Sequence, residues 1–239
     1  MMVIQKCKKA PKKLDEFRNK YNTSSIERGG LYERFKDECK EGYEELAIQL
    51  LKEQNKLCCY CMRKIDSECK KKNFHIEHFK PKDKYSNLAL DYRNLLASCN
   101  GGHNENKTCG HAKGNRELEY IPNPACCEKG KKDFFERGLI YKINGEISVR
   151  DDYFNNEQEK LQAMKDLNEV LRLNDELLVE ARKNKYYWFL HKWKDFSSRK
   201  QSNKTKCSEF FDRYTKKNGF FDFYGFVKFL FLKKCLDNG

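Results

Sequence analysis

Two cysteines at C-x-x-C spacing, Cys58 and Cys61 in LCCYCMRK, constrain this chain more than any other feature. A tight turn at this spacing lets two thiolates point at one tetrahedral ion, so the pair is half of a candidate zinc site. Cys99 and Cys109 are the best second pair, because the Gly and Asn residues between them permit sharp turns. Four thiolates around Zn²⁺ form a closed, structural site. The sequence therefore predicts a zinc-braced unit in this part of the chain.

The remaining cysteines are expected to be substitute ligands or ordinary buried thiols. The N-terminal segment MMVIQKCKKAPKK has no apolar core of signal-peptide length, so we expect a cytoplasmic protein. Disulfides are rare in that reducing compartment, and cysteine spacings there indicate metal sites first. Cys59, Cys126 or Cys127 could replace one of the four zinc ligands. Buried thiols are expected at the other positions: Cys7, Cys39, Cys69, Cys207 and Cys235.

Charge and composition narrow the class of protein. The chain has 49 Lys plus Arg against 36 Asp plus Glu, a formal net charge of +13, which favours a polyanionic partner such as nucleic acid. Its apolar runs are short, as at 229–232, and none approaches the about 20 residues that a membrane span needs, so no membrane association is expected. With 38% hydrophobic residues, including 17 Phe and 13 Tyr, the chain can bury a core and is not disordered throughout.

Outside the cysteine-rich segment the pattern is mainly helical, with one hairpin. Apolar residues such as Leu46 and Leu50 predict a helix over about residues 44–55. The segment GLIYKINGEISV predicts two short strands around Asn144-Gly145, a pair that favours a type I′ turn. We therefore expect an α+β fold. Its expected regions are N-terminal helices (1–56), a zinc-braced core (57–118), and a hairpin with C-terminal helices (119–239).

The C-terminal third is expected to be helical. Asn174, followed by two acidic residues, has the pattern of an N-cap that opens a helix. Before it, four apolar residues fall on one face of a helix: Leu161, Met164, Leu167 and Leu171. The aromatic stretch 220–232 is either part of the core or a docking face for a partner.

A series of acid, imidazole and amide residues runs through the cysteine framework. Glu77 and His78 are adjacent in FHIEHFKPKD, Asn94 follows in RNLLASC, and His111 lies in CGHAKG. A carboxylate and a neutral imidazole that converge can hold a catalytic divalent ion, and an unligated imidazole can take a proton from water. His75 alternates with Glu77 on the predicted strand, so it could face the same site.

These residues, in this order, resemble the HNH endonuclease family and its zinc-braced ββα-metal motif over about residues 57–114. The resemblance implies that His78 is the general base and that Asn94 holds the loop and orients the His78 ring. It also implies that Glu77 and His111 bind the catalytic divalent ion, with Mg²⁺ or Mn²⁺ expected. Because an extra histidine, His103, lies in the preceding loop, the last ligand stays open between His111 and His103.

The whole chain most resembles the HNH nuclease component of the Septu anti-phage systems, which is also found as a retron effector. The segments that carry this resemblance are KLCCYCMRKI, HIEHFKPK, NLLASC, CGHAKGN, the Asn-Gly hairpin and LNEVLRLND. It implies a hetero-oligomer with a PtuA-like ATPase subunit, and in the retron case a reverse transcriptase with its RNA–DNA product. The family context favours DNA as the substrate, and RNA, including tRNA, is compatible with the same site.

A non-catalytic protein that binds nucleic acid is an alternative, because it would need the same net positive charge. Lys80, Lys82 and Lys113 lie beside the motif, where ammonium groups would meet phosphates. A zinc-dependent nucleic-acid-binding module would need those lysines and the four cysteines. It would have no use for the series of Glu77, His78, Asn94 and His111, and that series favours an enzyme. A third hypothesis is an interaction protein that works through its aromatic C-terminal segment.

Overall fold

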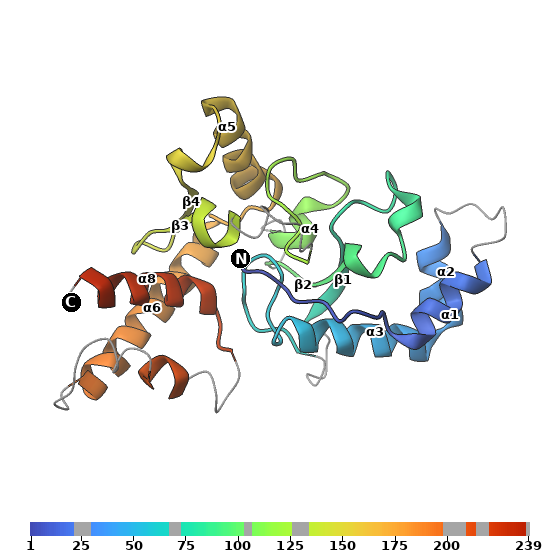
Figure 1. The fold of residues 1–239 in the computed structure, drawn as a ribbon, viewed down its shortest axis with the longest axis horizontal. Helices are drawn as coiled ribbons and strands as arrows, with labels where there is room; N and C mark the ends of the chain where they lie inside the picture. The colour runs from blue at the N-terminus through green and yellow to red at the C-terminus, as the bar shows by residue number, and fades with distance from the viewer. Residues whose placement is uncertain are drawn as a thin grey trace.

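A computed structural model describes residues 1–21, 30–66, 73–102, 107–125, 134–197, 209–213 and 220–237. The fold is α+β, as predicted: helices predominate, and the two small sheets described have two strands each. Figure 1 shows the N-terminal helices at one end, the first sheet in the middle and the C-terminal helices at the other end. In the described part of the chain, no helix is long and apolar enough to cross a bilayer.

The N-terminal helices form a small layer that supports the first sheet. They are α1 (Lys12–Tyr21), α2 (Leu31–Glu38) and α3 (Lys40–Glu53). Helix α3 begins four residues before the predicted start. Its Gly42 lets α1 approach closely: a Cβ there would lie 2.7 Å from the Cys39 sulfur and 3.0 Å from Lys13 Cβ. Leu46 and Leu50 are fully buried, as the apolar spacing predicts.

The first sheet pairs β1 (Phe74–His78) with β2 (Leu95–Cys99) in antiparallel register, with Glu77 opposite Leu96. Every residue of β2 is buried. The buried side chain of Gln54, just after α3, accepts a hydrogen bond from Ala97 N and donates one to Ala97 O. The short helix α4 (Cys109–Lys113) packs against β2. This strand, strand and helix unit lies between α3 and the C-terminal half of the chain (Figure 1).

The second sheet confirms the predicted hairpin but not its turn. Strands β3 (Leu139–Tyr141) and β4 (Ile147–Val149) pair antiparallel. A type I′ turn needs positive φ at both central residues. Here Gly145 has φ +97° and Asn144 does not have a positive φ. Gly145 N instead donates to Lys142 O at 2.9 Å, so the turn is one residue longer and only Gly145 is left-handed.

The helices after the hairpin differ from the prediction in two places. Helix α5 (Glu157–Lys165) continues into a wider π turn, η6 (Asp166–Val170), and α6 (Glu176–Ser197) follows. Asn174 does not cap α6: its amide brackets β4, accepting from Ile147 N and donating to Ile147 O. Asp175 caps α6 instead, accepting from Leu177 N at 3.2 Å. Leu161 is 55% exposed, so the predicted apolar face begins later: Met164 is partly buried against the core, and Leu167 and Leu171 are fully buried.

The aromatic C-terminal segment packs inside the molecule. Helix α8 (Tyr224–Asp237) packs across α6 (Figure 1), and Phe226 and Phe231 are fully buried. The Phe231 ring lies 5.0 Å from the rings of both Phe189 and Trp193. These side chains are therefore core. Docking by the C-terminal region as a whole stays a prediction.

Candidate functional site

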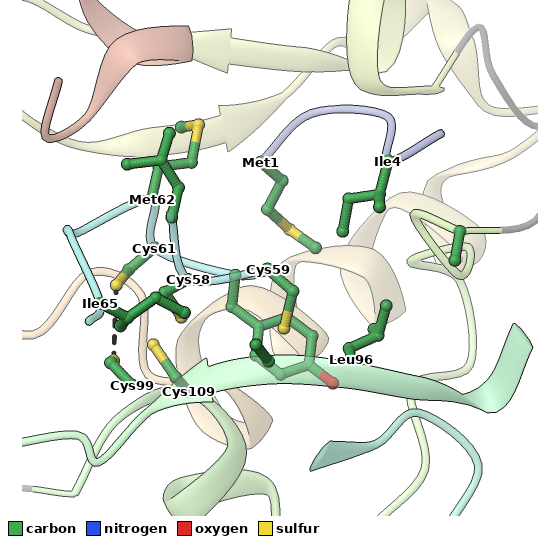
Figure 2. Packing of buried hydrophobic residues seen from close by; sticks show 14 of the residues in the cluster. Met1, Ile4, Cys58, Cys59, Cys61, Met62, Ile65, Leu96, Cys99 and Cys109 are labelled. Atoms are coloured by element: carbon green, nitrogen blue, oxygen red, sulfur yellow. Dashed lines mark hydrogen bonds between the residues drawn. The ribbon is translucent and has the colours of Figure 1, made fainter. Parts of the chain in front are cut away.

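The cysteines Cys58, Cys61, Cys99 and Cys109 converge. Their sulfur atoms all lie within 4.8 Å of one another and all four residues are buried. Figure 2 shows the C-x-x-C turn above and the end of β2 and start of α4 below. The Cys61 and Cys99 sulfurs are 3.7 Å apart. Zn–S bonds of about 2.3 Å in a tetrahedron place sulfurs about 3.8 Å apart, so the group fits a structural Zn²⁺.

The alternative zinc ligands are not in this group. Cys59 is buried beside it, but its sulfur is not among the converging atoms, and burial raises the pKa of its thiol. Cys126 and Cys127 lie outside the described residues. The turn between the first two ligands is closed by two backbone bonds, Met62 N to Cys58 O and Cys58 N to Arg63 O.

Two arginines add positive charge around the four thiols. Arg63 places Nη2 3.6 Å from the Cys99 sulfur and 3.3 Å from Gly101 O. Arg182 of α6 is fully buried and donates to Gly145 O and Leu173 O, at 2.6 and 2.7 Å. Burial lowers the pKa of Arg182 to about 10, while nearby thiols such as Cys61 oppose that shift. Arg63 Nε and Arg182 Nη1 are buried without a hydrogen-bond partner among the described residues, and a Zn²⁺ ion held by four thiolates would carry a net charge of −2 for these guanidinium groups to balance.

On β1, His75 and Glu77 point to one face, toward α4. His75 Nε2 lies 3.4 Å from Glu77 Oε2, and the His75 and His111 rings lie edge to face, with centroids 4.3 Å apart. Gly110 is what permits this approach: a Cβ there would lie 2.6 Å from Glu77 Oε2 and 2.7 Å from His75 Nε2. The structure thus brings Glu77 and His111 near each other and adds His75, which sequence reasoning placed second to them.

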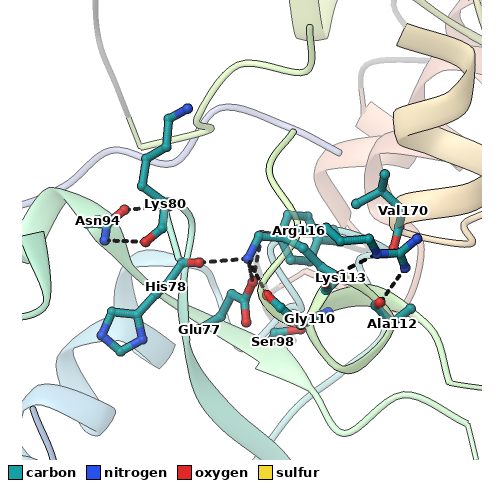
Figure 3. Close-up of polar contacts among 12 residues, drawn as sticks. Glu77, His78, Lys80, Asn94, Ser98, Gly110, Ala112, Lys113, Arg116 and Val170 are labelled. Carbon is teal, nitrogen blue, oxygen red and sulfur yellow. Dashed lines mark hydrogen bonds and ion pairs between the residues drawn. The ribbon is translucent and has the colours of Figure 1, made fainter. Parts of the chain in front are cut away.

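Lys113 differs from its predicted role at the nucleic-acid surface. It is 1% exposed, and its Nζ lies 2.9 Å from both Glu77 Oε1 and His78 O (Figure 3). The ammonium is therefore unavailable to a phosphate, because it is buried in an ion pair. Burial by itself would raise the pKa of Glu77, but contacts with His75 and Lys113 lower it overall. Tyr60 also donates to Oε1, which leaves Oε2 as the oxygen that faces His75 and Gly110.

His78 lies on the other side of β1. Figure 3 shows its ring pointing away from the Glu77 carboxylate, as expected for consecutive strand residues. Its Nε2 lies 2.9 Å from Ala89 O, and the Tyr32 ring covers it at 4.5 Å. A carbonyl oxygen can only accept, so Nε2 carries the hydrogen and Nδ1 keeps the lone pair. Burial lowers the pKa of His78 below its usual value, so the ring is neutral at pH 7.

Asn94 braces the two segments around His78. Its Oδ1 accepts from Lys80 N at 2.7 Å, and its Nδ2 donates to Lys80 O at 3.0 Å and Leu88 O at 3.1 Å. Lys80 follows His78 by two residues, and Leu88 precedes Ala89, whose carbonyl accepts from His78. Asn94 therefore acts on the His78 ring through the backbone rather than by direct contact.

The two other predicted phosphate contacts lie nearer the surface. Lys80 pairs with Glu117 at 3.0 Å, and Lys82 pairs with Glu33. Both ammonium groups thus have acidic partners in this structure. His103, the alternative last ligand, lies outside the described residues. Sequence reasoning did not single out Arg63, although a basic residue two positions after a C-x-x-C pair could have suggested a charge partner for thiolates.

Comparison with known proteins gives one partial match. No protein-family model matches the chain. Over 81 residues, 34% of the chain, the sequence is 37% identical to the Septu protein PtuB of Bacillus thuringiensis. The match covers 28% of that protein, so less than a third of the relative's length is spanned. About a third of this chain is therefore similar to a Septu protein.

Proposed function

We propose that this chain is a metal-dependent HNH endonuclease that hydrolyses phosphodiester bonds in nucleic acid. The observation that carries the proposal is the setting of His78, a neutral imidazole whose Nε2 is fixed on Ala89 O by segments that Asn94 braces. A histidine held in this tautomer is prepared to accept a proton at Nδ1. A binding module has no need for that arrangement.

In the proposed reaction, His78 Nδ1 takes a proton from the water that attacks the scissile phosphorus. The Ala89 carbonyl then stabilises the imidazolium, because it holds the Nε2 hydrogen throughout. A divalent ion, Mg²⁺ or Mn²⁺, would stabilise the charge on the phosphoryl and leaving 3′ oxygens. Glu77 Oε2 and His111 are the groups of this chain that would hold it.

His75 is a candidate third ligand for the same ion. Its Nε2 lies 3.4 Å from Glu77 Oε2, and its ring contacts His111. Its other ring nitrogen, Nδ1, is buried and has no hydrogen-bond partner among the described residues. The case for a ligand role rests on Nε2, which lies on the side of the ring that faces the Glu77 carboxylate.

The four-cysteine group has a structural role in this proposal. The β1, β2 and α4 unit is small, and units of that size bury too little surface to hold a site rigidly without a metal or disulfide. Zinc would tie the C-x-x-C turn to the end of β2 and the start of α4. Of the candidate catalytic groups, His111 lies on α4, and Glu77 and His78 lie on β1, which pairs with β2.

The likeness to PtuB supports a role in Septu anti-phage defence, and we propose that the chain acts there with an ATPase subunit. Control of the nuclease by this partner would protect the host from a constitutively active enzyme. DNA is the favoured substrate, with RNA as the alternative. A retron reverse transcriptase as a further partner stays a prediction.

One observation favours the runner-up, a non-catalytic zinc-dependent nucleic-acid-binding module. Lys113 already neutralises Glu77, so the carboxylate has a structural partner without any ion. In that case the protein would bind nucleic acid through surface charge alone. Nucleic acid would then be retained and never cut.

The test uses supercoiled plasmid and total RNA, each incubated with purified protein under Mg²⁺, Mn²⁺ or EDTA, with and without the ATPase subunit. We expect nicked plasmid or shortened RNA with either ion and none in EDTA, since one site of this kind cuts one strand. Binding without cleavage under every condition would support the module instead.

A further inference from the structure

A cavity beside the first sheet has no part in the mechanism proposed above. Its volume is about 630 Å³, within the range of about 300–1,000 Å³ typical of ligand sites. It lies between the segment after His78, the stretch 118–123 and residues that follow β4. The side chains that matter for its chemistry are Phe79, Arg93, Glu119, Tyr120, Tyr153 and Phe154.

Residues next to His78 in the sequence line the cavity, so it lies close to the proposed general base. Phe79 and Lys80, which follow His78 directly, both line it, and so do Leu88 and Asn94. Leu88 precedes Ala89, the residue that holds the His78 ring. A nucleic-acid strand whose scissile phosphate lies at His78 would therefore have a neighbouring nucleotide within reach of this cavity.

The lining suits a nucleobase better than a phosphate. Aromatic side chains, among them Tyr120, Tyr153 and Phe154, offer surfaces on which any base can stack. Glu119 and Asp91 are carboxylates, which repel phosphate but can accept hydrogen bonds from the amino groups of a base. Arg93 is exposed and, among described residues, its guanidinium has no acidic partner, so it can meet the backbone that leads to the base.

We propose that this cavity receives an unpaired nucleobase next to the scissile phosphate. The preferred substrate is then a single-stranded or locally unpaired nucleic acid. A duplex keeps its bases stacked and would have to pay for extruding one. This inference rests on the proposed nuclease function, because it is the site at His78 that brings the strand to the cavity.

The test measures binding by the full chain, carrying His78→Ala so that no substrate is cut. Single-stranded DNA and RNA oligonucleotides containing 2-aminopurine are compared with the duplex of the same sequence. We expect either the DNA or the RNA single strand to bind at least tenfold more tightly than the duplex of the same sequence. On binding, the fluorescence of 2-aminopurine should be quenched as the base stacks. Tyr120→Ala should weaken single-strand binding about tenfold and abolish the quenching, within the range for losing one stacked base.

Tyr120 is 38% exposed, so its truncation leaves the core intact. Tyr187→Ala is the matched control: this tyrosine is 50% exposed on α6 and does not line the cavity. Arg93→Ala should also weaken single-strand binding, with Arg93→Lys restoring part of it. Equal affinity for single strand and duplex, or no effect of Tyr120→Ala beyond that of the control, would overturn the inference.

Cleavage by the protein with His78 intact is measured separately, so the two proposals can fail independently. If Tyr120→Ala cuts single strand and duplex as fast as the wild type does, the cavity has no role in substrate recognition, and the proposed nuclease function is unaffected. If quenching depends on Tyr120 but no condition gives cutting, base binding in the cavity is supported and the proposed nuclease function is contradicted.

Discussion

Glu77 and Lys113 are opposite charges buried side by side, exposed by 6% and 1% respectively. A buried charge is stable only when it is paired, and this pair is completed by Tyr60 and the His78 carbonyl. Lys113 therefore holds Glu77 in place and ties α4 to the end of β1. The same pairing keeps Glu77 ionised, the form in which it could bind a cation.

Lys113→Met is expected to destabilise the protein by about 3–5 kcal/mol, because it leaves the Glu77 carboxylate buried and unpaired. The double variant Lys113→Met with Glu77→Gln should recover part of that loss, since no buried charge remains. Urea unfolding followed by circular dichroism measures both. Lys107→Met, at an exposed position, is the control, and equal stabilities of Lys107→Met and Lys113→Met would contradict the burial argument.

Gly110 marks a contact that no larger residue can make. Gly110→Ala should cost about 1–3 kcal/mol of unfolding free energy, because its Cβ would meet Glu77 and His75 at under 3 Å and push α4 away from β1. Gly30→Ala is the matched control, since a Cβ at Gly30 has no atom within 4 Å. If both variants unfold at the same urea concentration as the wild type, α4 does not pack on β1 as described.

At the scale of elements, β1, β2 and α4 are short, and none would be stable alone. Besides the Lys113–Glu77 pair, three contacts help to hold them together: the buried amide of Gln54, the packing of α3 against β2, and the four-cysteine group. In that group the sulfurs of the C-x-x-C turn meet those at the end of β2 and the start of α4 (Figure 2). A metal there would lock the elements that carry the candidate catalytic groups.

Removing the metal should loosen this unit before the rest of the molecule. The purified chain is expected to carry one zinc by native mass spectrometry. After treatment with a chelator, amide hydrogens of β1 and β2 should exchange much faster, while those of the α6–α8 pair stay protected by their aromatic core. Unchanged exchange in β2 after complete loss of zinc would contradict a structural role for the ion.

At the scale of the whole molecule, the parts predicted best are those with local signals. The hairpin around Asn144-Gly145, although not its turn type, follows from a local turn signal, and the convergence of four cysteines follows from ligand spacing. The predicted N-cap of α6 is wrong, because the Asn174 side chain hydrogen-bonds to the backbone of Ile147 in β4 instead. The residues near Asn174 in the sequence give no sign of that contact.

The sequence predicted which residues form the candidate site better than it predicted how they are arranged. Side chains alternate along β1, so His78 points to the opposite face from Glu77, and His75 points to the same face as Glu77. This arrangement can be predicted once the strand is known. The burial of Lys113 does not follow, because exposed and buried lysines look alike in sequence. The cavity beside Asn94 is assembled from several stretches that are distant in the sequence, so no single stretch indicates it.

The most direct measurement is cleavage of nucleic acid by His78→Ala compared with His191→Ala, whose imidazole is 73% exposed on α6. Zinc content and unfolding midpoint are recorded for both variants, so that loss of activity can be separated from loss of structure. We predict that His78→Ala keeps its zinc and its fold but loses Mg²⁺- or Mn²⁺-dependent cleavage by at least a hundredfold, as expected for removal of a general base. His191→Ala should cut like the wild type. Full activity of a folded His78→Ala protein would contradict the role of His78 as the base.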